Sequence, residues 1–203
     1  MASDRLTVLA DAAIDLIADA GMRGLTHRAV DARAALPQGT TSAYLRTRKA
    51  LVEAVVHRLA DLDQRDLEAT DLPAEIAAPG PLTGDDLAQI ADGIAALLDG
   101  WLTVDRRRTL ARYHCVLAAT HNPELRSILV HGQPSRAQAR ALLAAAGSPD
   151  PARAGDHLVA CIDGLLFDRL AGAGARTAPR PGTAEGRSDL ATAVRALLTA
   201  FAG

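Results

Sequence analysis

Aromatic side chains are scarce in this chain of 203 residues, where Phe, Trp and Tyr together make up 2%. A binding site with few aromatic rings is poorly suited to holding flat cations, so an aliphatic or moderately polar ligand suits the composition better. Cysteine is rare as well. Cys115 and Cys161 lie far apart and form no CxxC pair, which argues against a disulfide framework and against a structural zinc site.

The chain also has little that would direct it to a membrane. Its first 21 residues are apolar at many positions but carry Asp4, Asp11, Asp15 and Asp19, which a secretory signal peptide would exclude. No uncharged apolar run reaches the ~20 residues that a membrane-spanning helix needs. We therefore expect a soluble, cytoplasmic protein with no membrane partner.

Helix-forming residues are what the sequence has in abundance. Hydrophobic residues make up 49% of the chain, alanine dominates them, and runs of β-branched residues are absent. Leu6, Leu9, Ala13 and Leu16 recur at steps of three and four, and Gly21 follows as a stop. The predicted fold class is all-α. The same patterning predicts helices over residues 4–20, 27–33, 37–45, 48–71, 85–102, 105–121, 123–146, 152–173 and 186–202.

Proline and glycine mark the breaks between these helices. Residues 72–84 are rich in both and form the best candidate for a loop or domain boundary. Pro134 lies within the 123–146 segment and should kink or split that helix. Residues 171–186 contain repeated Gly and Pro and are predicted to form a mobile connection between the last two helices.

Charge is distributed unevenly along the chain, although the total is only −2. Residues 23–49 carry five Arg and Lys49 against a single acid, Asp31, a net charge of +5 on two short helices and their turns. A basic helix, a tight turn and a second short helix rimmed by hydroxyls is the arrangement that places a recognition helix in the major groove of DNA. An ordinary solvated helical hairpin could carry the same charge. The order of the residues must therefore distinguish a DNA-binding helix-turn-helix from such a hairpin.

Residues 25–51 read LTHRAVDARAALPQGTTSAYLRTRKAL. They contain a Thr-capped helix, a small and then an aliphatic residue at a turn, Gly-Thr opening the next helix, an aromatic residue near its end and a basic residue starting the helix after it. These positions are Thr26, Ala35, Leu36, Gly39, Thr40, Tyr44 and Arg48. In this order they resemble the DNA-binding signature of the tetracycline-repressor (TetR) family of transcriptional regulators. The resemblance covers about fifty residues and extends further only as overall layout.

The resemblance implies a helix-turn-helix DNA-binding domain over residues 1–50, with a linking helix over about 48–71. Residues 51–203 would form a helical regulatory, ligand-binding and dimerisation domain. The implied function is sequence-specific regulation of transcription, as a homodimeric repressor that a small-molecule effector releases from a palindromic operator on double-stranded DNA. Neither enzymatic activity nor a cofactor is implied.

The recognition helix is predicted to span Pro37–Tyr44. Pro37 and Ser42 depart from the family, which usually has Ser and Tyr there, so the DNA sequence preference of relatives does not transfer. Gln38 and Thr40 are the candidates for base edges, because Gln can pair with adenine and a Thr methyl can pack on thymine. The predicted DNA-binding residues are Thr26, Arg28, Pro37, Gln38, Gly39, Thr40, Thr41, Ser42, Ala43, Tyr44, Arg48 and Lys49, of which Thr26, Arg28, Tyr44 and Arg48 would contact phosphate.

The last two helices look too apolar for solvent and are the predicted dimer interface, although the same residues could face only the monomer's own core. The predicted interface residues are Leu158, Cys161, Ile162, Leu165, Leu166, Leu170, Leu190, Val194, Leu197, Leu198 and Phe201. A ligand pocket is expected inside the helical bundle, lined by Trp101, Tyr113, His114, Cys115, His121, Asp163 and Phe167. Each of these could equally be an ordinary core or interface residue.

Other kinds of site receive less support. The spacings of the His and Cys residues match no recurrent zinc pattern, and no helix-start context lowers the pKa of either thiol for nucleophilic catalysis. No phosphate-binding GxxxxGK[ST] loop is present. The alternative to a regulator is a helical interaction module or enzyme whose basic hairpin is incidental.

Overall fold

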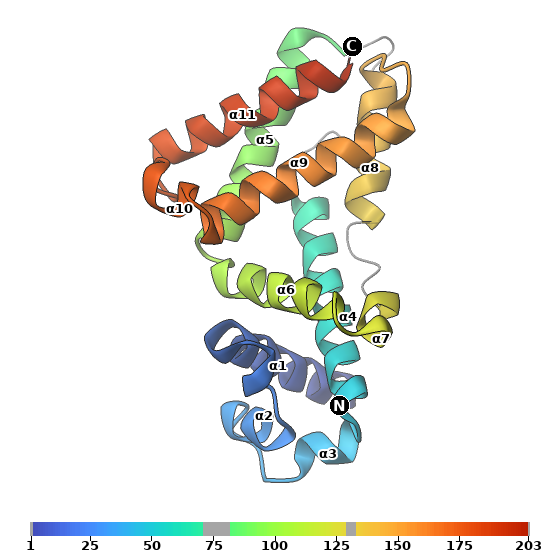
Figure 1. The fold of residues 1–203 in the computed structure, drawn as a ribbon, viewed down its shortest axis with the longest axis vertical. Helices are drawn as coiled ribbons and strands as arrows, with labels where there is room; N and C mark the ends of the chain where they lie inside the picture. Colours follow the sequence, from blue (N-terminus) through green and yellow to red (C-terminus); the bar gives the residue numbers. More distant parts are fainter. Residues whose placement is uncertain (1, 71–81, 129–132, 203) are drawn as a thin grey trace. The chain divides into compact units, whose positions relative to one another are not determined.

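The computed structural model describes residues 2–70, 82–128 and 133–202, and all regular structure within these ranges is helical (Figure 1). The predicted all-α fold class is therefore confirmed. In chain order the helices are α1 (Ala2–Gly24), α2 (His27–Arg33), α3 (Thr40–Tyr44), α4 (Arg48–Ala69), α5 (Gly84–Leu102), α6 (Arg106–Ala119), α7 (Pro123–Ile128), α8 (Gln133–Ala145), α9 (Pro151–Ala171), α10 (Gly174–Thr177) and α11 (Ala184–Ala202). They group into two compact units, Met1–Asp63 with Asp105–His131 (unit 1) and Gln64–Val104 with Gly132–Gly203 (unit 2).

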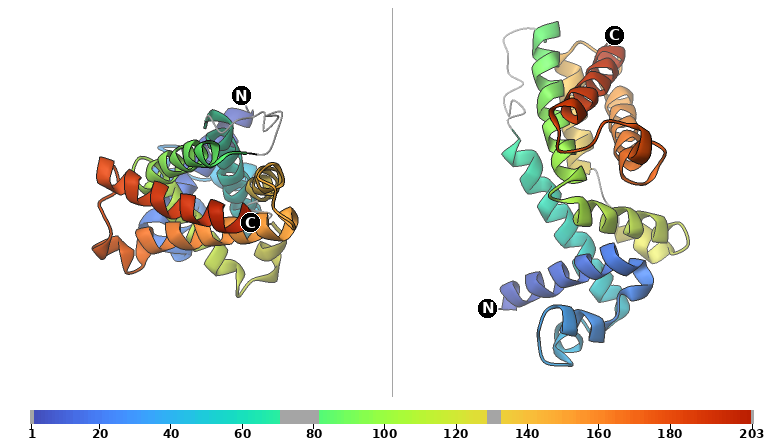
Figure 2. Two further views of the ribbon diagram at one scale, coloured as in Figure 1. Left: turned by 90° about the horizontal axis from the view of Figure 1, so that it is seen from above. Right: turned by 90° about the vertical axis from the view of Figure 1, so that its left-hand side faces the viewer.

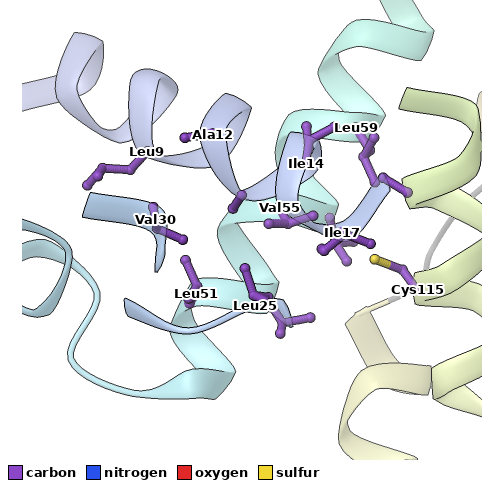
Figure 3. Close-up of a cluster of buried hydrophobic side chains, with 14 of the residues drawn as sticks. Leu9, Ala12, Ile14, Ile17, Leu25, Val30, Leu51, Val55, Leu59 and Cys115 are labelled. Carbon is purple, nitrogen blue, oxygen red and sulfur yellow. The ribbon is translucent and has the colours of Figure 1, made fainter. Parts of the chain in front are cut away.

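Unit 1 is organised around one apolar core, to which α1, α2, α4 and α6 all contribute (Figure 3). Ile17 of α1, Val30 of α2 and Val55 of α4 are each fully buried, and Cys115 of α6 closes the cluster. Burying one such aliphatic side chain contributes about 1.5–3 kcal/mol. The three-and-four spacing of apolar residues in α1 thus serves to pack that helix against the start of α4 and against α6.

The N-terminal helix is interrupted where its sequence indicates a stop. Gly21 has φ 64° and ψ −171°, outside the helical region, and a short helical segment follows it to Gly24. Thr26 then caps α2, because its Oγ1 accepts a hydrogen bond from the Ala29 N–H at 3.2 Å. Thr47 caps α4 in the same manner through the Ala50 N–H, at 3.0 Å.

Unit 2 is a separate helical bundle in which α5 packs against α11 and α8 against α9 (Figure 2). Its fully buried side chains include Leu98, Leu143, Leu158 and Leu198. α5 starts with a capping box, in which Thr83 Oγ1 accepts from the Asp86 N–H and Asp86 Oδ2 accepts from the Thr83 N–H at 2.7 Å. α8 and α9 approach so closely that a Cβ at Gly155 would lie 2.6 Å from the Arg140 backbone nitrogen.

The predicted break in the 123–146 segment is confirmed, because the segment forms two helices, α7 and α8. Pro134 is the second residue of α8, where its missing N–H costs no helical hydrogen bond. Another sequence prediction needs correction. The connection over 171–186 is more structured than predicted. It contains α10, and its Gly182 N–H donates to the buried Asp99 carboxylate at 2.6 Å. Most of the predicted loop over 72–84 lies outside the described residues.

Among the described residues, no single helix is both long and apolar enough to cross a membrane, although α5 and α6 taken together reach the length and composition of one bent span.

Candidate DNA-binding helix-turn-helix

The turn between α2 and α3 is tight and is closed by backbone hydrogen bonds. The Leu36 N–H donates to Asp31 O at 2.9 Å, and the Ala34 N–H donates to Val30 O at 2.9 Å. Between them Ala35 takes φ 53°, a left-handed conformation that non-glycine residues seldom adopt. Leu36 is then half-buried against the unit 1 core. The small and aliphatic residues of the sequence motif thus reverse the chain and anchor it.

The start of α3 is held by a carboxylate that lies eight residues upstream. Asp31 Oδ2 accepts from the Gly39 N–H, and its Oδ1 accepts from both the N–H and the hydroxyl of Thr41, over 2.5–2.7 Å. Asp31 is 3% exposed. Burial raises the pKa of this carboxyl, but the hydrogen bonds from Thr41 and Gly39 outweigh burial and leave the pKa below its usual value. Asp31 is therefore a buried anion that fixes the recognition helix.

The recognition helix is shorter than predicted. Gly39 has φ 95°, which a helix cannot contain, so Pro37–Gly39 form a turn and α3 covers only Thr40–Tyr44. The Thr40 N–H donates to Pro37 O at 3.1 Å and its hydroxyl donates to the same oxygen at 2.6 Å. Gln38 therefore projects from the turn before the helix.

Most of the predicted DNA-binding residues lie on the surface of this unit. Thr40 is half-buried, and Thr41 is fully buried with its hydroxyl held by Asp31. Thr41 is thus a correction to the prediction, because its side chain positions α3 and cannot reach DNA. The exposed members are Thr26, Arg28, Pro37, Gln38, Gly39, Ser42, Ala43, Tyr44, Arg48 and Lys49.

Arg48 has a structural role that the sequence pattern did not indicate. Its Nη1 donates to Leu25 O and its Nη2 to Met22 O, both at 2.5 Å. These contacts tie the first turn of α4 to the segment that joins α1 and α2. His27 adds a second tie, because its Nε2 donates to Leu45 O at 2.6 Å. These contacts hold the chain just after α3, and the Asp31 contacts hold its start.

Acids of α1 neutralise part of the basic charge counted from the sequence. Arg33 donates to Asp19 at 2.7 Å, and Arg107 of α6 pairs with Asp19 and Asp15 at 2.8 Å each. The hydrogen bonds from Arg107 and then Arg33 lower the pKa of Asp19 to about 2. Arg33 is thus ion-paired within unit 1. The other cations of residues 23–49, namely Arg23, Arg28, Arg46, Arg48 and Lys49, are exposed.

The predicted ligand-pocket residues divide between the two units. Tyr113, His114 and His121 belong to unit 1, whereas Trp101, Asp163 and Phe167 belong to unit 2. His121, Asp163 and Phe167 are exposed, with Phe167 at 40%, so the expectation that they point inward is wrong. His121 lies between α6 and α7, and α9, which carries Asp163 and Phe167, buries Leu158 and Leu166 instead.

The remaining pocket candidates are wholly or partly buried. Trp101 is buried, and its indole Nε1 donates to Asp66 Oδ2 at 2.7 Å. Tyr113 and His114 are half-buried. Cys115 is part of the unit 1 core, where burial raises the pKa of its thiol to about 12 and makes it a poor nucleophile. Among the described side chains, no three His, Cys, Asp or Glu residues gather as metal ligands.

The predicted dimer residues are mostly core residues of unit 2. Ile162, Leu165, Leu197 and Phe201 are half-buried, and Cys161 is exposed. The exposed residues of α9 between 157 and 167 are instead His157, Ala160, Cys161, Asp163, Gly164 and Phe167, of which Ala160, Cys161 and Gly164 are small. The predicted interface residues that are buried within the unit itself, and whose assignment is corrected, are Leu158, Leu166, Leu170, Leu190, Val194 and Leu198.

Comparison with known proteins agrees with this architecture. The family model of the tetracycline repressor-like C-terminal domain matches residues 85–200. A transcriptional regulator from Rhodococcus sp. Rha1 superposes with a TM-score of 0.74 at 20% identity, over 97% of this chain and 95% of that one. A search of curated proteins found no matching sequence.

Two further solved structures share more of the sequence. A TetR-family member from Streptomyces coelicolor A3 has a TM-score of 0.70 at 25% identity, over 95% of this chain and 97% of that chain. The multidrug binding protein EbrR in complex with ethidium has a TM-score of 0.66 at 25% identity, over 95% and 98%. Together with the family match over more than half of the chain, the helix-turn-helix in unit 1 shows that this protein belongs to the tetracycline repressor (TetR) family of ligand-responsive, DNA-binding transcriptional regulators.

Proposed function

We propose that the chain represses transcription by binding a palindromic operator as a homodimer in the cytoplasm, and that a small molecule releases it. The observation that carries the proposal is the set of hydrogen bonds from Gly39 and Thr41 to Asp31, which fixes the start of α3. Gln38 in the turn before α3, and Ser42 and Tyr44 within α3, are exposed. A recognition element needs this combination of rigid backbone and exposed polar side chains. Residues 1–50 are the proposed DNA-binding part and 51–203 the regulatory part.

The contacts with DNA are assigned by exposure and chemistry. Gln38, in the turn before α3, is the proposed reader of adenine, and Thr40 can offer its methyl group to thymine. Arg28, at the start of α2, and Tyr44, which is 45% exposed, are proposed to contact phosphate. Lys49 and Arg48 extend that phosphate surface along the first turn of α4.

A titration with DNA tests these assignments. The probe is a fluorescent duplex carrying the palindrome found upstream of the protein's own or a neighbouring gene, and binding is followed by anisotropy at several salt concentrations. Arg28→Ala should weaken binding to all duplexes and reduce the salt slope by about one unit. Gln38→Ala should cost about 1–3 kcal/mol at one base position and relax specificity there. Arg153→Ala, which removes an exposed charge from α9, is the control and should change neither.

Two results of the titration would contradict these assignments. If wild-type protein binds the palindrome no better than an unrelated duplex, the proposed operator recognition is wrong. If Arg28→Ala leaves the salt slope unchanged, the phosphate contact of that residue is wrong while the overall function stands.

The homodimer is proposed to form through the exposed face of α9, together with α11. Ala160, Cys161 and Gly164 lie on this face, and a Cβ at Gly164 would meet no atom within 4 Å. Small side chains let two helices approach closely, and Phe167 would add a large apolar contact. Two recognition helices about 34–36 Å apart would then meet successive turns of DNA.

Sedimentation at micromolar concentration tests the dimer. Wild-type protein should sediment as a dimer, and Gly164→Arg should shift it toward monomer because a long charged side chain would enter the interface. Ala152→Arg places the same charge at an exposed position in the first turn of α9 and should leave the dimer intact. Monomeric wild-type protein would contradict the proposal.

The effector is proposed to be aliphatic or moderately polar. The EbrR structures contain ethidium, proflavin and malachite green, but that ligand range is EbrR's own. With 2% aromatic residues and Trp101 already donating to Asp66, this chain has few rings to stack on a flat cation. Malachite green, titrated into the protein without DNA, should bind weakly or not at all. Micromolar binding of the dye would overturn this assignment.

A further inference from the structure

A cleft of about 360 Å³ opens within unit 1, away from the pocket residues that the sequence suggested. Its volume falls in the range of small-molecule sites. Its lining residues come from the end of α1, the start of α4, and the end of α6 with the beginning of α7. The lining residues are Met22, Arg48, Lys49, Val52, Ala118, Asn122 and Leu125.

The cleft combines an apolar wall with two cations. Val52 is 2% and Leu125 is 7% exposed, and both belong to the apolar core of unit 1, against which Met22 and Ala118 also pack. Arg48 and Lys49 are exposed and adjacent at the first turn of α4. An apolar floor beside two positive charges is complementary to an amphiphilic anion.

The geometry of Arg48 narrows the class of ligand. Its two hydrogen bonds to Leu25 O and Met22 O use one N–H on each Nη atom, which holds the guanidinium in place and leaves it positively charged. The remaining N–H groups of this guanidinium can donate to a carboxylate, and its fixed positive charge favours one. We propose that this cleft binds a small carboxylate with a short aliphatic body, its carboxylate at Arg48 and Lys49 and its carbon chain against Val52 and Leu125.

This carboxylate site would give the proposed repressor a small-molecule ligand. The regulatory role of the site rests on the proposed function. Arg48 and Lys49 are also the proposed phosphate contacts, so a bound carboxylate would neutralise charge that DNA needs. Binding of the two ligands would then oppose each other reciprocally, as linked equilibria must. The carboxylate would act directly on the DNA-binding unit.

Methionine provides a local probe for the test. The chain contains two Met residues, so a ¹³C-methyl-methionine spectrum of the full-length protein gives Met22 a signal of its own. Hexanoate is the probe, titrated at constant ionic strength, and hexanamide is the uncharged control of equal length. We expect a saturable shift of the Met22 methyl signal with hexanoate, with a Kd of about 1 mM for so small a ligand, and at least about tenfold weaker binding of hexanamide.

Two variants test whether hexanoate binds in the cleft or elsewhere on the protein surface. Lys49→Gln changes an exposed side chain, so it should leave folding intact and weaken hexanoate several-fold. Ala118→Leu should fill the cleft and abolish the shift, with thermal unfolding as a check on its fold. The proposal is overturned if the Met22 signal stays still, if hexanamide shifts it equally, or if Lys49→Gln binds hexanoate as wild type does.

Measuring the affinity for DNA distinguishes the proposed carboxylate site from the proposed operator binding. At matched ionic strength, hexanoate should weaken binding of the palindrome relative to chloride, and Lys49→Gln should reduce that effect. Saturable hexanoate binding without any effect on DNA would overturn the regulatory part. Absence of DNA binding even without hexanoate would contradict the proposed function and leave the cleft standing.

Discussion

Asp31 and Thr41 form the central contact of the helix-turn-helix, where the Asp31 Oδ1 accepts from the Thr41 hydroxyl at 2.5 Å and from its N–H at 2.7 Å. Both residues are buried. A carboxylate at the start of a helix satisfies N–H groups that have no partner within the helix and interacts favourably with the helix dipole. Because α3 has only five residues, it depends on this contact more than a long helix would.

Replacing the carboxylate should destabilise unit 1 and weaken DNA binding together. Asp31→Asn retains shape but loses the charge and one acceptor, so we expect the free energy of unfolding to fall by about 1.5–3 kcal/mol at pH 7. Denaturant unfolding measures this change. Asp61→Asn, at an exposed position of α4, is the matched control and should stay within about 0.5 kcal/mol of wild type.

The same carboxylate predicts a dependence on pH. The pKa of Asp31 is lower in the folded chain than its ordinary value of 3.8, so folding favours the ionised form. Its contribution is complete above the unfolded pKa and is lost as the pH falls from about 3.8 through the lower folded value. The difference in stability between wild type and Asp31→Asn should therefore shrink in acid. A constant difference between pH 7 and pH 3 would contradict the ionised state of Asp31.

Arg48 is predicted to have two separable effects. Arg48→Ala removes both hydrogen bonds to Met22 O and Leu25 O, and we expect a loss of about 1–2 kcal/mol in stability together with a salt slope for DNA binding that is flatter by about one unit. Arg48→Lys keeps the charge but cannot span both carbonyls with one planar group. It should lose stability while retaining the slope. An unchanged slope in Arg48→Ala, measured by anisotropy, would remove Arg48 from the phosphate contacts.

Local signals in the sequence predicted most of the helices. Most of the wrong predictions concern residues whose contacts lie far along the chain. Thr26 and Thr47 were recognisable as caps because a cap bonds within three residues. Asp31 looked like a lone opposing charge, because its partners lie eight and ten residues away. The dimer prediction selected the most apolar residues of α9, such as Leu158 and Leu166, but burial within the monomer has the same signature as burial between two monomers.

The left-handed residue in the turn gives a prediction of increased stability. Ala35 has φ 53°, where a Cβ costs about 1 kcal/mol and glycine pays no such penalty. Ala35→Gly should therefore stabilise unit 1 by up to about 1 kcal/mol, despite the greater freedom of glycine in the unfolded chain. Ala32→Gly lies in the last turn of α2 and should destabilise it by about 0.5–1 kcal/mol. Thermal unfolding of the two variants should move in opposite directions, and a lowered melting temperature for Ala35→Gly would argue against the strained turn.

Two glycines on α9 should respond to alanine with opposite signs. A Cβ at Gly155 would lie 2.6 Å from the Arg140 nitrogen and 2.8 Å from its Cα, both backbone atoms of α8 that cannot move aside alone. Gly155→Ala should therefore separate α8 from α9 and cost about 1–3 kcal/mol. Gly164→Ala meets no atom within 4 Å in the monomer and gains up to about 1 kcal/mol in helix propensity. Denaturant unfolding, extrapolated to zero protein concentration to remove the contribution of a dimer, compares them on the same helix. Equal effects would show that α8 and α9 are not packed as closely as the structure has them.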